Sequence, residues 1–169
     1  MKKKVLITRR LLKENEDKLK ELFDVKLNDN DELYSSDKII ELSKGYDGIL
    51  CAVTDQFNKE LINKLSSSIK IIANFAVGYG NIDINAAKER NIVVTNTPEV
   101  LDDSTADVSI LLLLGASRKV LEARRAAELQ NWKWSADFML GKQMSNKRLG
   151  ILGMGRIGRA VAKRARGFN

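Results

Sequence analysis

Three closely spaced glycines near the end of the chain could bind a phosphate-bearing ligand. The segment Gly153–Gly158 reads GMGRIG, follows the apolar run 147–152 and opens an amphipathic stretch over 156–166. Glycines at this spacing between a strand and a helix are typical of a dinucleotide-binding turn. The first glycine permits the tight turn, the second lets a pyrophosphate approach the backbone, and the third lets the helix pack on the strand. The free N–H groups at the start of the helix then bind the anion.

A second glycine-containing loop could bind a carboxylate. Residues 76–81 read AVGYGN and directly follow the apolar run 70–75. Ligands of open α/β sheets bind outside the carboxyl ends of the strands, and consecutive exposed N–H groups can hold an anion there. A plain glycine turn fits the same spacing equally well, so both interpretations stay open at this point.

The remaining chemistry-bearing residues do not form a complete catalytic set. The 169 residues include no histidine, the commonest side chain for proton transfer near neutral pH. No pair of carboxylates and no group of metal-ligating residues has convincing spacing. We therefore predict neither a catalytic residue nor a metal site within this chain.

The first hundred residues alternate short apolar runs with amphipathic stretches. This alternation predicts a parallel sheet with helices on both faces, and hence an α/β, flavodoxin-like domain. The expected strands are 4–8, 24–27, 48–53, 70–75 and 92–95, and the expected helices are 11–22, 36–44, 58–65 and 83–90. Asp83 is placed to cap the last of these helices.

The rest of the chain has a different pattern. A long helix is expected over 104–129, with a first half so apolar that it should be buried on most sides. An extended arm over 130–146, which holds Trp132 and Trp134, should follow. A strand over 147–152 and a helix over 156–166 would then form the first βα unit of a Rossmann dinucleotide-binding fold.

The net charge of +7 arises entirely in the last segment. Residues 147–169 hold seven basic and no acidic side chains. Binding of nucleic acid is disfavoured, because the segment has one aromatic residue, Phe168, and no nucleic-acid motif. The single cysteine, Cys51, lies in an apolar run and should be buried in a protein of a reducing compartment. No apolar run approaches the length of a membrane span, so a soluble, cytoplasmic chain is expected.

Four stretches taken together resemble the D-2-hydroxyacid dehydrogenase family, and within it the glyoxylate and hydroxypyruvate reductases. They are KIIANFAVGYGNID (70–83), IVVTNTPEVL (92–101), STADV (104–108) and LGILGMGRIGRAVAKRARGF (149–168). The resemblance implies two domains: a substrate-side domain over residues 1–100 and the start of an NAD(P)-binding domain over 101–169. The second domain would be incomplete.

The resemblance also assigns roles to individual residues. The backbone N–H groups of Val77 and Gly78 would bind the substrate carboxylate, and Thr105 would contact the cofactor near the hinge. The pyrophosphate site would be formed by Gly153, Gly155, Arg156, Ile157 and Gly158. The helix and arm over 104–146 would form the contact of a homodimer. Glu99 stands where the family usually has glycine, which matters if that turn needs a positive φ.

The reaction implied is hydride transfer from NADH or NADPH to a 2-oxo acid, glyoxylate or hydroxypyruvate by preference. In the family an arginine and a histidine paired with a carboxylate complete the site, and these lie beyond the position of Asn169. This chain by itself is therefore expected to be inactive. Phosphoglycerate dehydrogenase, D-lactate dehydrogenase and a non-catalytic dimerising fragment remain alternatives.

Overall fold

The computed structural model describes residues 1–130 and 132–169; Asn131, in the predicted arm, lies outside the described residues. The chain forms two compact units, Met1–Pro98 and Glu99–Asn169. Within the described residues, no helix combines the length and the apolar character needed to cross a membrane.

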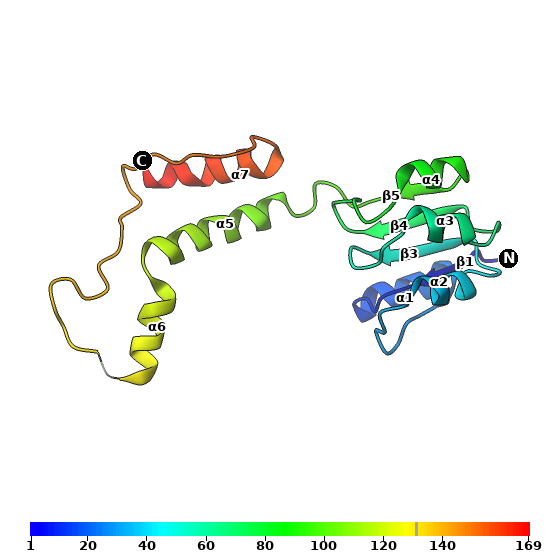
Figure 1. The fold of residues 1–169 in the computed structure, drawn as a ribbon, viewed down its shortest axis with the longest axis horizontal. Helices are drawn as coiled ribbons and strands as arrows, with labels where there is room; N and C mark the ends of the chain where they lie inside the picture. The colour runs from blue at the N-terminus through cyan, green and yellow to red at the C-terminus, as the bar shows by residue number, and fades with distance from the viewer. Residues whose placement is uncertain (131) are drawn as a thin grey trace. The chain divides into compact units, whose positions relative to one another are not determined.

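The first unit is built on a five-stranded, fully parallel sheet (Figure 1). Its strands are β1 (Lys4–Ile7), β2 (Asp24–Lys26), β3 (Gly48–Ala52), β4 (Ile71–Phe75) and β5 (Val93–Thr95), in the spatial order β2-β1-β3-β4-β5. This is the flavodoxin-like order, so the fold class predicted from the alternation of apolar runs is confirmed.

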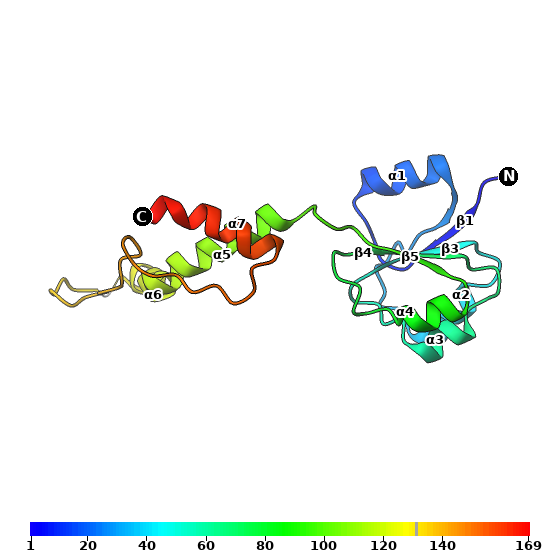
Figure 2. The ribbon, with the colours of Figure 1, turned by 90° about the horizontal axis from the view of Figure 1, so that it is seen from above.

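Helices cover the two faces of the sheet unequally. The helix α1 (Lys13–Leu22) lies on one face, and α2 (Ser36–Leu42), α3 (Lys59–Lys64) and α4 (Ile84–Glu89) lie on the other (Figure 2). The three shorter helices each begin at a polar cap: the side chains of Ser35, Asn58 and Asp83 accept from a backbone N–H three residues on. Such a cap contributes about 1 kcal/mol, which matters for a helix of two turns. The predicted cap at Asp83 is confirmed.

The hydrophobic core lies between the sheet and these three helices. Its members are at most 5% exposed and alternate along the strands, since successive strand side chains point to opposite faces. The strands contribute Leu6, Ile49, Cys51 and Ile72, and the helices contribute Ile39, Leu61, Ile62, Ala86 and Ala87. Cys51 is buried, as its apolar surroundings predicted.

The second unit is helical in its described residues. The helices α5 (Asp102–Ser117) and α7 (Arg156–Ala165) lie side by side, and a 3₁₀ turn, η1 (Arg166–Phe168), follows α7. The guanidinium of Arg164 in α7 bonds the carboxylates of Asp103 and Asp107 in α5. Arg156 at the start of α7 is also paired with a carboxylate of α5, that of Asp102, so two of the seven basic side chains of residues 147–169 form ion pairs within the unit.

The single helix predicted over 104–129 is wrong. The structure has α5 and then α6 (Val120–Leu129), because Arg118 ends α5 and Lys119 takes a left-handed conformation with φ of 54°. A left-handed residue cannot continue a right-handed helix. The apolar pattern runs across the break and does not reveal it.

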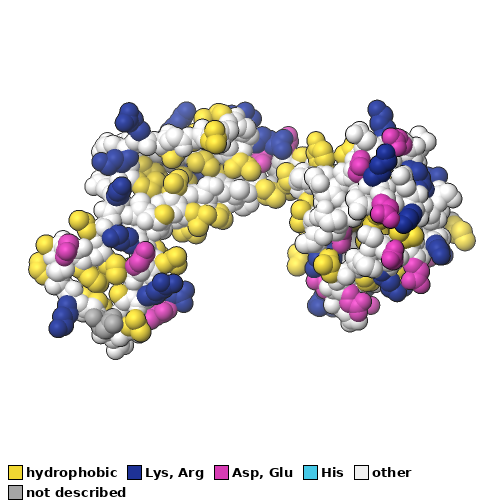
Figure 3. Space-filling view, viewed as in Figure 1, with side chains coloured by type: hydrophobic (Ala, Val, Ile, Leu, Met, Phe, Trp, Pro, Cys, Tyr) yellow, Lys and Arg dark blue, Asp and Glu magenta, His cyan; other side chains and the backbone are white. Residues whose placement is uncertain are grey.

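The predicted burial of the apolar half of that helix is also wrong. Only Ala106 is buried in α5, while Leu111 and Leu112 are each about two-thirds exposed. Hydrophobic side chains gather on the surface of this unit in Figure 3. The sequence pattern shows how much apolar surface α5 has, but not how much of that surface is buried. In the structure α7 covers only part of the apolar surface of α5.

The strand predicted over 147–152 does not form. These residues are irregular up to α7, and no described residue of the second unit is in a strand. A strand is stable only when its N–H and C=O groups pair with a neighbouring strand. Within this chain the βα unit therefore consists of its turn and its helix.

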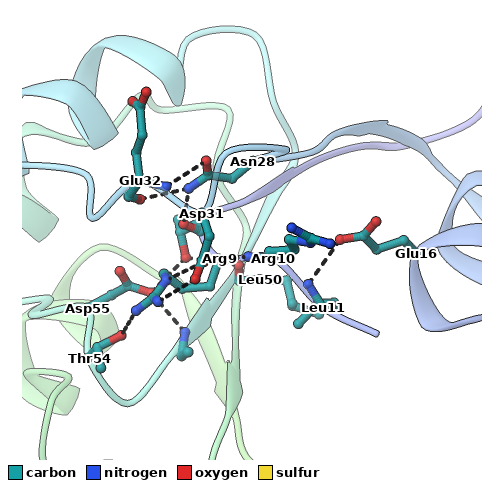
Figure 4. A network of polar contacts seen from close by, with 12 residues as sticks. Arg9, Arg10, Leu11, Glu16, Asn28, Asp31, Glu32, Leu50, Thr54 and Asp55 are labelled. Atoms are coloured by element: carbon teal, nitrogen blue, oxygen red, sulfur yellow. Dashed lines mark hydrogen bonds and ion pairs between the residues drawn. The ribbon is translucent and has the colours of Figure 1, made fainter. Parts of the chain in front are cut away.

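A polar network holds the loops that leave β1, β2 and β3 together (Figure 4). The guanidinium of Arg9 donates to both carboxylate oxygens of Asp31 at 2.8 and 2.9 Å and to the hydroxyl of Thr54 at 2.6 Å. Beside it the buried Asp55 accepts from the hydroxyl of Thr8 at 2.7 Å and from the backbone N–H of Ala52 at 2.9 Å. These contacts order the edge of the sheet where its strands end.

Burial of Cys51 should make its thiol unreactive. Removal from water, helped by the charge of Asp55, raises the pKa of Cys51 to about 12. The reactive thiolate is then about a thousandfold scarcer than in an unfolded chain. We expect iodoacetamide at about pH 8 to leave the folded chain unlabelled and to add one group in guanidinium chloride, as measured by intact mass. Equal labelling rates in both conditions would contradict this placement of Cys51.

The pair of Arg9 and Asp31 should make the stability of the first unit depend on acid pH. The hydrogen bonds from Arg9, and then from the N–H of Arg10, hold the pKa of Asp31 well below its usual range. A lowered carboxyl pKa stabilises the fold above the unfolded value of about 4, and this contribution disappears as pH falls toward the folded value.

We therefore expect Asp31→Asn to lower the urea midpoint at about pH 7 and to have progressively less effect below about pH 4. Asparagine tolerates the positive φ of 52° at this position, so the change tests the charge rather than the backbone. A difference that stays constant down to about pH 2 would show that the charge is not responsible.

Candidate functional site

The loop after β4 turns three successive carbonyl groups into the first unit. The carbonyl oxygen of Ala76 accepts from the backbone N–H of Thr97 at 2.9 Å. That of Val77 accepts from the side-chain amide of Asn96 at 2.7 Å, and that of Gly78 from the side-chain amide of Asn74 at 2.9 Å.

The N–H groups of the same peptides face the other way. In a planar trans peptide the N–H points away from the C=O, so inward carbonyls turn the N–H groups of Val77, Gly78 and Tyr79 away from those donors. None of these three groups donates a hydrogen bond to any described residue. A Cβ built on Gly78 would meet nothing within 4 Å, so a ligand can approach the backbone there. The loop thus presents three hydrogen-bond donors and open space, an arrangement that suits a carboxylate as the acceptor.

Two buried asparagines hold this loop in place through hydrogen bonds. Asn74 and Asn81 are 2% and 8% exposed, and the amide of Asn74 donates to the side-chain oxygen of Asn81 at 3.0 Å. Asn81 in turn donates to the carbonyls of Asp55 and Ala52 at 2.9 and 3.2 Å. Because both of those acceptors are carbonyls, the orientation of the Asn81 amide is fixed, and that of Asn74 follows from it.

Gly153, Gly155 and Gly158 shape the turn before α7 and the first turn of that helix. Gly153 has φ of 93°, which disfavours any other residue. A Cβ on Gly158 would lie 2.2 Å from the carbonyl oxygen of Gly153, so the start of α7 packs directly on the turn. A Cβ on Gly155 would meet nothing within 4 Å, which leaves open space against the backbone where the helix begins. These three arrangements fit a bound pyrophosphate group.

The other predicted cofactor residues lie close to this turn. Arg156 and Ile157 are exposed in the first turn of α7, and Thr105 is half-buried in the first turn of α5. The two helix starts are tied together, since the guanidinium of Arg156 lies 3.1 Å from the carboxylate of Asp102 and 3.7 Å from that of Glu99. Glu99 has φ of 67°, so this turn does take the conformation that favours glycine.

The predicted site residues thus fall into two groups, each within its own unit. Val77 and Gly78 share one loop, whereas Thr105 and the segment Gly153–Gly158 lie together in the other unit. Among the described residues there is no group of three or more metal-ligating side chains.

Sequence reasoning missed the residues that shape the loop. Asn74 interrupts an otherwise apolar strand, and Asn96 follows β5, at the same edge of the sheet. A buried amide in an apolar run must find hydrogen-bond partners, so this interruption was an available signal. Which carbonyls the amides would reach could not be known without the fold.

Comparison with known proteins gives one consistent family. The model of the D-isomer specific 2-hydroxyacid dehydrogenase catalytic domain matches residues 5–158. Glyoxylate reductase of Korarchaeum cryptofilum is 41% identical, with 99% of this chain and 51% of the relative covered. Glycerate dehydrogenase of Hyphomicrobium methylovorum is 36% identical, with 99% and 52% covered. A solved protein structure from Thermus thermophilus superposes with a TM-score of 0.88 at 37% identity, over 98% of this chain and 53% of that one.

The chain therefore spans about half the length of the relatives that it matches. The match nevertheless runs through both units, from β1 to Gly158 in the first turn of α7. This protein chain belongs to the D-isomer specific 2-hydroxyacid dehydrogenase family.

Proposed function

We propose that the chain provides the carboxylate-binding loop and the pyrophosphate-binding turn of an NAD(P)H-dependent reductase of small 2-oxo acids. The observation that carries this proposal is the loop of Val77 and Gly78, whose carbonyls are held inward and whose N–H groups have no partner among the described residues. Its acceptor is the carboxylate that every 2-oxo acid possesses. Glyoxylate or hydroxypyruvate is the proposed substrate, in line with the glyoxylate reductases and the glycerate dehydrogenase among the relatives.

The turn over Gly153–Gly158 is proposed to hold the nicotinamide cofactor by its pyrophosphate. The hydride for reduction comes from NADH or NADPH bound there. Backbone N–H groups at the start of α7 bind the anion, and the open space beside Gly155 lets the phosphates approach. Arg156 in the first turn of α7 and Thr105 in the first turn of α5, which the pair of Arg156 and Asp102 joins to α7, are proposed to contribute polar contacts. The acidic residue that binds the ribose of NAD is expected about 20 residues after the turn, at a position that the 169 residues do not include. The proposal therefore covers both NADH and NADPH.

Residues 1–100 are the proposed substrate-side domain and residues 101–169 the proposed start of the cofactor domain, in a cytoplasmic protein. Reduction of a 2-oxo acid also needs a proton donor to the carbonyl oxygen and a cation that orients the substrate. The chain has no histidine. We propose that these groups come from the part of the family's sequence that this chain does not match, and that the 169 residues alone do not turn over substrate.

A functional test separates binding from turnover. The purified chain, with its intact mass confirmed, is mixed with glyoxylate and NADH or NADPH, and absorbance of the reduced cofactor is followed. We expect no oxidation. In parallel, a titration with ADP-ribose, which contains the cofactor's pyrophosphate, is followed by amide NMR, and the amides of residues 155–158 are expected to shift.

The matched variant is Gly158→Ala. Its methyl group would overlap the carbonyl oxygen of Gly153, so the start of α7 must move, and the ADP-ribose affinity should fall at least about tenfold. Gly115→Ala in α5 is the control, because it adds the same methyl group and the same gain in helix propensity where nothing lies within 4 Å. Unchanged ADP-ribose affinity in Gly158→Ala would refute the role of the turn, and clear glyoxylate turnover would refute the need for further residues.

We also propose that α5, α6 and the following arm, over residues 104–146, form a homodimer contact. Val108, Leu111 and Leu112 recur at helical spacing on α5 and are each more than half exposed. Beyond α6, the rings of Trp132 and Phe138 stack at 5.7 Å. An apolar surface of this kind is typical of an obligate interface. A dimerising protein without catalysis is the alternative function that this surface favours.

Sedimentation equilibrium tests the dimer. The chain should be dimeric at micromolar concentration, and Leu112→Glu should raise the dissociation constant at least about tenfold, because it places a charge in a desolvated contact. Ile84→Glu makes the same kind of change at an exposed position of α4 and should leave the dissociation constant unaltered. A monomeric wild-type chain would rule the dimer out.

A further inference from the structure

The loop after β4 offers one more N–H group than the two assigned so far. The Gly78–Tyr79 peptide has its carbonyl turned inward to the amide of Asn74 at 2.9 Å. Its N–H, on Tyr79, therefore points away from that donor and has no partner among the described residues. The residue Tyr79 is 55% exposed and its neighbour Gly78 is exposed too, so this peptide lies at the surface.

The side-chain amide of Asn74 is held in one orientation by hydrogen bonds on both its nitrogen and its oxygen. Its two hydrogens are used by the carbonyl oxygen of Gly78 and the side-chain oxygen of Asn81. Its own oxygen accepts from the amide of Asn81 at 3.4 Å and from the thiol of Cys51 at 3.5 Å. A side chain so fully bonded and 2% exposed holds one orientation.

The loop itself has little else to fix that peptide. Gly78 and Gly80 flank Tyr79, are exposed and have open space where a Cβ would be. Glycine gives the backbone more freedom than any other residue, so the peptide between Gly78 and Tyr79 depends on a hydrogen bond from outside the loop. Without that bond the carbonyl oxygen of Gly78 could face the ligand, where it would repel a carboxylate.

We propose that Asn74 is a positioning residue, which fixes the Gly78–Tyr79 peptide so that the N–H of Tyr79, beside those of Val77 and Gly78, faces a bound carboxylate. This inference rests on the proposed function of the loop. It adds the N–H of Tyr79 as a third donor to the carboxylate site. The orientation of this N–H depends on Asn74, whose side chain extends from strand β4. Asn74 itself touches no substrate.

The test is an amide NMR titration of the whole chain with oxamate, a non-reducible analogue of a 2-oxo acid. In the wild type the amides of Val77, Gly78 and Tyr79 should shift together. Asn74→Ser is neutral and too short to reach the carbonyl of Gly78, and it should weaken oxamate binding at least about tenfold. The Tyr79 amide should lose most of its ligand-induced shift.

The matched control is Asn28→Ser, which also removes hydrogen bonds of a buried asparagine, those to the carbonyls of Thr8 and Glu32, but leaves Asn74 and all its partners unchanged. It should destabilise the fold and change oxamate affinity by no more than about threefold. A purely structural role of Asn74 would make the two variants alike. If the Asn74→Ser chain does not fold, the isosteric Asn74→Asp replaces it, with Asn85→Asp on the exposed surface of α4 as the control for added charge.

Each outcome is decisive. Wild-type binding that Asn74→Ser leaves unchanged overturns the positioning role, while the carboxylate site at Val77 and Gly78 stands. Absence of any oxamate-induced shift at residues 77–79 of the wild type refutes the carboxylate site, and the role of Asn74 falls with it.

Discussion

Buried polar groups must find partners inside the protein, and this constraint shapes the carboxyl edge of the sheet. Parallel strands bring all their carboxyl ends to that edge, where loops must carry unpaired backbone groups. Here the buried side chains of Thr8, Asn74 and Asn81 fill this need by bonding to Asp55, to one another and to loop carbonyls, while the second carboxylate oxygen of Asp55 has no partner among the described residues. The exposed pair of Arg9 and Asp31 closes the same edge on the side of β1. The conformation of the loop after β4 thus follows from the hydrogen bonds that the side chains at this edge make with its carbonyls.

The sequence predicts what local pattern and burial determine. The strands over 48–53 and 70–75 could be recognised because short, largely apolar runs fit a parallel sheet covered on both faces. The strand over 147–152 was wrongly expected, since a strand depends on a neighbour and the second unit has none among its described residues. The break at Lys119 was missed because hydrophobic pattern is blind to one left-handed residue. The roles of Asn74 and Asn96 depend on carbonyl directions that only a folded chain defines.

The first unit buries its hydrophobic side chains more completely than the second unit does. In the first unit, three capped helices and the sheet enclose a continuous core. In the second, α5 and α7 pack on each other and share ion pairs, yet much of α5 stays exposed. Each Å² of apolar surface left in water costs roughly 25 cal/mol of free energy relative to burying it. The second unit therefore has more to gain than the first from contact with further polypeptide.

The inward carbonyls of the loop after β4 have a consequence for the anion binding proposed for it. A row of N–H groups gives the surface positive partial charge without any cationic side chain, and peptide groups do not titrate in the physiological range. Attraction of this kind is short-ranged and directional, so it distinguishes a planar carboxylate by shape as well as by sign. A lysine in the same place would draw any anion from a distance and lose its charge when desolvated. The loop of Val77 and Gly78 thus favours selectivity over long-range capture, at constant strength across pH.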